Sequence, residues 1–142
     1  MVAELLIALA ALGAPAAAGV APFAGAQRAM SEKEARTPAQ RKLDSQLLYE
    51  IYRRRGEAER KGVPSGATLV KIDGRGRALV DVRAEVGPVL LKKIRASGAT
   101  VVSTAAEYRT IIAWIPLMKL ETLAGDASIR AIMPAPEAVI AR

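Results

Sequence analysis

Apolar residues recur at helical spacing over residues 38–56. Thr37-Pro38 has the features of a helix start, because Thr can cap a helix and Pro at the first helical position loses no hydrogen bond. The following apolar positions predict one amphipathic helix that ends at Gly56: Leu43, Leu47, Leu48 and Ile51. Residues 57–66 are rich in Gly and Pro and predict a linker.

From residue 67 onward, short β-type runs alternate with helical ones. Thr68–Ile72 and Arg77–Arg83 flank Asp73-Gly74-Arg75-Gly76, a sequence typical of a β-hairpin turn. From Arg77 the predicted order is strand, helix, strand, strand, helix, strand. The later elements are expected at residues 88–97, 100–108, 110–115, 116–124 and 129–133. This order is typical of an α+β, ferredoxin-like βαββαβ sandwich over residues 67–134, with two helices on one face of an antiparallel sheet.

The run from Thr110 to Ile115 is apolar on both faces of its expected strand. Alternation places Ile112 and Trp114 on one face, and the small Ala113 suits the crowded face beneath the helices. Ile112 and Trp114 are therefore expected on the face that no helix of the sandwich covers. Two interpretations stay open: the N-terminal helix folds back over that face, or the face binds a partner with Trp114 as an anchor.

The N-terminus has features of an exported protein. Residues 5–26 carry no charge, but Gly and Pro interrupt them, and Ala24-Gly25-Ala26 before Gln27 fits the rule for signal cleavage. We expect residues 1–26 to be a signal peptide and residues 27–37 a flexible segment. The mature protein is expected to be secreted, or periplasmic in the cell envelope, with no membrane contact. A retained anchor is the alternative, because Glu4 stands where a signal peptide carries Lys or Arg.

Composition excludes several kinds of chemistry. The 142 residues include 21 Lys and Arg against 14 Asp and Glu, with no His and no Cys, so a Ser-His-Asp triad or a zinc-thiolate site cannot be assembled from this chain. The carboxylates show no metal-ligand spacing, and we expect no metal, no cofactor and no enzymatic activity. The basic residues are scattered and aromatics make up 4%, which disfavours a nucleic-acid partner.

Three parts of the chain carry a resemblance to a known family: residues 41–48, which read Arg-Lys-Leu-Asp-Ser-Gln-Leu-Leu, residues 90–102, and residues 108–124 with 129–132. Together they resemble the N-terminal propeptide region of secreted bacterial subtilisin-like serine peptidases. Residues 41–48 look like the helix ahead of that region, residues 90–102 are similar to its first helix and following strand, and residues 108–124 and 129–132 resemble its second half. The catalytic domain of such a peptidase is missing from this chain, which has no His.

The resemblance implies an inhibitor and folding chaperone of a subtilisin-like peptidase, acting in trans or as the remnant of a truncated protease. The bare sheet face would pack on the peptidase, and an extended tail, residues 135–142, would enter its active-site cleft. The implied partner-binding residues are Ile112, Trp114, Pro134, Pro136, Glu137, Ala138, Val139, Ile140, Ala141 and Arg142. The competing interpretation is a secreted structural or interaction module that forms a weak homodimer through its exposed sheet face.

Overall fold

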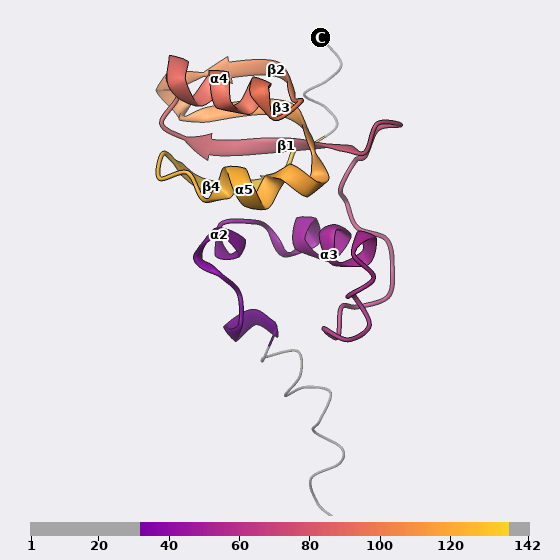
Figure 1. Ribbon diagram of the computed structural model, residues 1–142. Coiled ribbons are helices and arrows are strands. Elements are labelled where there is room, and N and C mark those ends of the chain that lie inside the picture. The colour runs from indigo at the N-terminus through magenta and orange to yellow at the C-terminus, as the bar shows by residue number, and fades with distance from the viewer. Residues whose placement is uncertain (1–31, 137–142) are drawn as a thin grey trace, which may run out of the picture.

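The computed structural model describes residues 32–136, which form an α+β fold (Figure 1). The predicted signal peptide, with Ala24, Ala26 and Gln27, lies outside the described residues. Within residues 32–136, no helix has the length and apolar character needed to span a membrane. The elements in chain order are α2 (Pro38–Arg41), α3 (Ser45–Arg54), β1 (Arg77–Ala84), α4 (Pro88–Ala96), β2 (Thr100–Ala105), η2 (Ala106–Tyr108), β3 (Thr110–Pro116), η3 (Leu117–Lys119), α5 (Leu120–Ala124) and β4 (Ile129–Pro134).

The four strands form one antiparallel sheet in the order β2-β3-β1-β4. β1 lies between β3 and β4 and is buried at every position except Arg77 and Arg83. The predicted turn before β1 forms: the Asp73 carboxylate accepts from the backbone N–H groups of Arg75 and Arg77, each at 2.9 Å. The strand expected ahead of this turn is reduced to a single bridge between Ile72 and Ala78.

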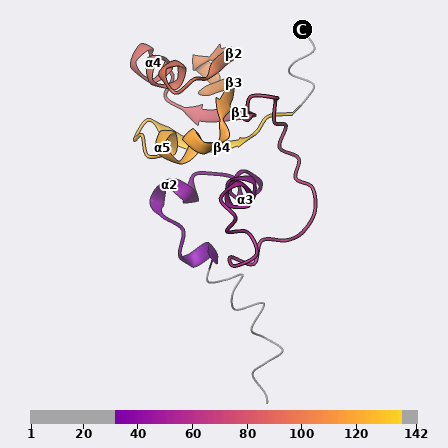
Figure 2. The same ribbon diagram turned by 45° about the vertical axis from the view of Figure 1, so that its right-hand side comes forward.

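Helices α4 and α5 lie on the same side of the sheet (Figures 1 and 2). Alternate side chains of the strands point toward these helices and form the main core with them. Its strand members are Ala78, Val80, Val82, Ala84, Ile111, Ala113, Ile115, Ile129 and Ile132, and its members from the two helices include Leu90, Ile94, Leu120 and Leu123. The predicted strand 100–108 is shorter than expected, because residues 106–108 form η2 and Arg109 adopts a left-handed conformation that turns the chain into β3.

The single N-terminal helix expected over residues 38–56 is two helices. Thr37 and Gln40 form the expected capping box, but α2 ends at Arg41 and α3 begins only at Ser45. Between them the chain pairs in parallel with the outer edge of β4: Asp44 N–H donates to the Ile132 carbonyl at 2.9 Å, and Ile132 N–H donates to the Lys42 carbonyl at 2.8 Å. The exposed edge of a strand gains backbone partners in this way, at the cost of the helix.

The predicted linker is held against α3 by side-chain hydrogen bonds. The Arg53 guanidinium donates to the carbonyls of Pro64 and Gly66 at 2.9 and 2.6 Å. Farther along, the Gln46 side chain accepts from Leu69 N–H at 2.6 Å. These bonds keep the linker and α3 together, so the linker does not let the helix range over the molecule.

Helix α3 lies at the β4 side of the sheet, below α5 in Figure 1, and its apolar stripe joins the core beneath α4 and α5: Leu47, Leu48, Ile51 and Tyr52. The interpretation in which this helix covers the opposite sheet face is therefore wrong. Residues 32–36, which precede α2, are also attached to α3. Glu32 accepts from Arg36 at 3.0 Å and from the Tyr52 hydroxyl at 3.1 Å. Burial and the neighbouring Glu32 carboxylate raise the pKa of Tyr52 to about 12, so this hydroxyl stays a donor.

Two leucines test whether α3 belongs to the folding core. Leu47 is fully buried, whereas Leu69, three residues after the linker, is 82% exposed. We expect Leu47→Ala to lower the free energy of unfolding by about 2–5 kcal/mol, because it leaves a cavity in the core. The same truncation at Leu69 should change it by less than about 0.5 kcal/mol. Urea denaturation followed by circular dichroism measures both, and equal midpoints for the two variants would contradict the packing of α3.

Candidate partner-binding face

The sheet face opposite the helices, here called the open face, carries a small apolar cluster. It contains the predicted Ile112 and Trp114, together with Leu79 and Ala135. Leu79, Ile112 and Ala135 are buried, and Trp114 is half-buried. Sequence reasoning missed Leu79, and it placed Ala135 in the extended tail without predicting that it is buried in this cluster. The signal for Leu79 was available, since residues 78–80 of β1 read Ala-Leu-Val and so place apolar residues on both faces of the strand.

The predicted tail begins beside this cluster. Pro134 ends β4 opposite Val80, and Ala135 N–H donates to the Leu79 carbonyl at 3.1 Å, which draws the chain onto the open face. Pro136 is exposed. The remaining predicted tail residues lie outside the described residues: Glu137, Ala138, Val139, Ile140, Ala141 and Arg142. The structure thus brings Ile112, Trp114 and the first residues after β4 together.

A cavity of about 490 Å³ adjoins the point where the chain leaves β4. Its apolar lining includes Leu69 and Met133, which are both exposed. Met133 belongs to the open face, because it pairs with Asp81 while its neighbour Ile132 faces the core. The cavity is lined by Pro134, Ala135 and Pro136, and the apolar cluster also contains Ala135, so the two adjoin. Together they could accept apolar side chains of a partner.

The other end of the open face is polar. Asp81 accepts from the Thr110 hydroxyl and, at 2.8 Å, from the Arg83 guanidinium. The side chain of Arg83 is about half in solvent, 46% exposed, whereas the side chain of Asp81 is 11% exposed. The open face therefore has an apolar end around Trp114 and a charged end around Arg83.

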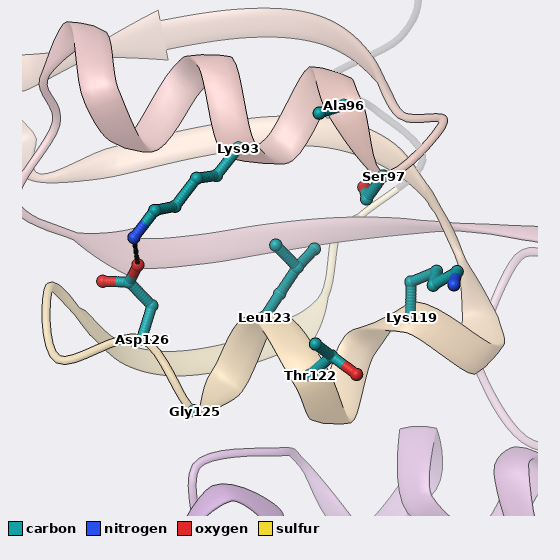
Figure 3. A pocket seen from close by; sticks show the side chains of 8 residues that line it. All are labelled: Lys93, Ala96, Ser97, Lys119, Thr122, Leu123, Gly125 and Asp126. Carbon is teal, nitrogen blue, oxygen red and sulfur yellow. Dashed lines mark hydrogen bonds and ion pairs between the residues drawn. The ribbon is translucent and has the colours of Figure 1, made fainter.

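A second cavity, of about 580 Å³, lies on the helix side between α4 and α5 (Figure 3). Lys93 reaches across its mouth to the Asp126 carboxylate at 2.8 Å. The same carboxylate accepts from the hydroxyl and the backbone N–H of Ser128, at 2.6 and 2.9 Å. The bonds from Lys93 and Ser128 hold the pKa of Asp126 well below its ordinary value of 3.8. These groups satisfy one another's hydrogen-bonding capacity. We therefore interpret the site as a structural junction that joins α4 to the loop after α5.

No cluster of His, Cys, Asp and Glu suitable for a metal ion occurs within residues 32–136. The open face holds one carboxylate, Asp81, whose two oxygens both accept hydrogen bonds within the face. Comparison with known proteins yields no matching family model, curated protein or solved structure. The arrangement on the open face is suited to recognising another surface through apolar contact and hydrogen bonds.

The hydrogen bonds of Asp126 predict how the stability of the protein depends on pH. A carboxylate whose pKa is lower in the folded state contributes stability above its unfolded pKa and loses it as the pH falls. Asp126→Asn should therefore be less stable than the wild type at pH 7, and the difference should shrink as the pH falls through 3.8. Urea midpoints at a series of pH values measure it, with the exposed Glu107→Gln as the control. A difference that is constant down to acid pH would show that the junction is not ionic.

Proposed function

We propose that this chain is a non-catalytic, propeptide-like domain that binds a subtilisin-like serine peptidase as an inhibitor and folding chaperone. The observation that carries the proposal is the apolar cluster around Trp114 on a sheet face without helices, continuous with the chain that leaves β4. Export from the cell belongs to the same proposal, because such peptidases are secreted.

The finer architecture is also a proposal: a ferredoxin-like sandwich. Its support is the order of elements from β1 to β4, the strand order β2-β3-β1-β4, and the position of α4 and α5 on one face. In this architecture the open face is the natural place for a partner, since the helices occupy the other.

The open face and the tail would act together on the peptidase. Trp114 is half-buried in the free domain, so a partner that covers it gains apolar burial without first unfolding anything. The chain beyond Pro136 would lie extended in the active-site cleft and add backbone hydrogen bonds by strand pairing. Occupying the cleft excludes substrate, which accounts for inhibition without any catalytic group on this chain.

The same binding energy accounts for a chaperone activity. A domain that binds the folded peptidase and not its unfolded chain stabilises the folded state by an amount that grows with concentration and affinity. The domain has a core beneath α4 and α5, closed by α3, that is built from its own residues. It could therefore act as a preformed surface in trans.

The direct test is titration of the purified protein into a subtilisin-type peptidase, followed by cleavage of a chromogenic peptide. Saturable inhibition supports the proposal. A folded domain that leaves the rate unchanged at every concentration contradicts it. Refolding of the denatured peptidase with and without the domain tests the chaperone activity separately.

Substitution of Trp114 separates binding from folding. Trp114→Asp should weaken inhibition by roughly 30-fold or more, because it places a charge in the centre of the interface. The free domain should unfold at only slightly lower urea concentration, since Trp114 lies outside the main core. Val89→Asp, at an exposed position on α4, is the matched control and should leave inhibition unchanged. If Trp114→Asp unfolds the free domain, the open face is internal core.

Deletion of residues 136–142 tests the tail. Inhibition should be lost, because the open face alone leaves the cleft free for substrate, while binding measured by calorimetry should persist at reduced affinity. A variant with residues 137–142 replaced by Gly and Ser in the same number controls for length. Full inhibition by both variants would show that the tail does not enter the cleft.

The competing function, a homodimer through the open face, predicts a different result. Sedimentation of the free protein would show mass rising with concentration, and Trp114→Asp would abolish the rise. Such a result, with no effect on any peptidase, would favour the interaction module over the inhibitor.

A further inference from the structure

One charged residue of the described chain is buried, and it lies on the open face. Asp81 is 7% exposed and sits on the central strand β1, with Ile112 and Met133 as its cross-strand neighbours. Burying a carboxylate is unfavourable unless hydrogen bonds compensate. An apolar residue here would extend the cluster around Trp114. The presence of a buried carboxylate at this position is explained by the groups to which it is hydrogen-bonded.

Asp81 forms an ion pair with Arg83. One carboxylate oxygen accepts from the Thr110 hydroxyl, and the other accepts from the Arg83 guanidinium at 2.8 Å. The two side chains are on the same face of one strand, two positions apart, so the bond lies along the sheet. Asp81 is covered, and the guanidinium remains half in solvent. The buried carboxylate therefore orients an exposed cation.

The side chains next to Arg83 are small, which leaves the guanidinium accessible on the face. Its cross-strand neighbours are Thr110 on β3 and Ala131 on β4, and Thr110 in turn pairs with Ala105 on β2. A guanidinium carries five N–H donors, and within residues 32–136 the hydrogen bond that the Arg83 guanidinium makes goes to Asp81. A partner that covers this part of the face removes water from the other donors, so it must supply acceptors in place of water.

We propose that Arg83 is a second anchor of the open face, which binds an oxygen acceptor, carboxylate or carbonyl, on the surface of the partner protein. The proposal rests on the proposed function and adds the chemistry of the partner. Leu79, in the apolar cluster, and Arg83 are four residues apart on β1, which is roughly 13 Å along a strand. The partner surface must therefore present an apolar group at the Trp114 end and an acceptor roughly 13 Å from it along the strand direction.

Three variants test the anchor through inhibition of a subtilisin-type peptidase. Arg83→Met keeps the length of the side chain and removes its donors, and it should weaken inhibition at least tenfold. Arg83→Lys, which keeps the charge and loses the fork of donors, should fall between Arg83→Met and the wild type. Arg95→Met, at an exposed position on α4 on the other side of the sheet, is the control and should inhibit like the wild type.

Asp81 is expected to be a positioning residue, and a double variant tests that role. Asp81→Asn should weaken inhibition in the wild-type background, but the combined Asp81→Asn/Arg83→Met variant should inhibit no worse than Arg83→Met alone. Additive losses would mean that Asp81 acts independently of Arg83. The salt dependence of inhibition distinguishes a carboxylate acceptor from a carbonyl. If the difference in inhibition between the wild type and Arg83→Met becomes smaller at high salt, the acceptor is a carboxylate; if the difference stays constant, the acceptor is a carbonyl.

The outcomes separate the anchor from the function on which it rests. If the wild type inhibits and Arg83→Met inhibits equally well, the anchor is wrong and the proposed function stands. If the folded wild type does not inhibit, the proposed function fails and the anchor with it. A loss of inhibition in Arg83→Met, with a urea midpoint close to that of the wild type, supports the anchor, because a merely structural ion pair would lower both together.

Discussion

Two backbone hydrogen bonds at the edge of β4 determine how the rest of this molecule is arranged. They join Lys42 and Asp44 to Ile132, and in doing so they end α2, begin α3 and close the outer edge of the sheet. Asp44 then caps α3 by accepting from Gln46 N–H at 2.8 Å. Because the chain is fixed at this edge, the apolar stripe of α3 meets the core beneath α4 and α5, and the opposite face stays open.

Consequently, the side chains of the open face are not part of the main folding core. The main core lies entirely on the helix side, and the cluster on the open face is small and separate from it. Ile111 and Ile112 are adjacent in sequence but belong to the two different clusters. Residues such as Trp114 and Arg83 can thus be suited to recognition while their neighbours on the same strands are suited to packing.

Local signals in the sequence predicted most of the fold, and non-local bonds account for what they missed. Thr37-Pro38 and the turn after Asp73 mark element ends through backbone preferences, and the alternating runs from residue 77 onward made the order of elements predictable. Alternation also placed Ile112 and Trp114 on one face. The break at Leu43 was not predictable, because its leucine fits helical spacing and the competing bonds come from Ile132, far along the chain. The attachment of the linker to Arg53 and the burial of Ala135 depend on tertiary contacts in the same way.

The two edges of the sheet indicate why the proposed recognition of a partner falls to the open face. The β4 edge is closed by Lys42–Asp44, and within residues 32–136 no strand pairs with the outer side of β2. β2 carries no charge that would deter pairing, but its register shifts between Val101 and Ser103, and such a bulge disrupts the regular row of groups that another strand needs. With one edge covered and the other irregular, side chains on the open face are the part of the sheet best placed to bind a partner. In the proposed complex, strand pairing with the peptidase would then be left to the chain beyond β4.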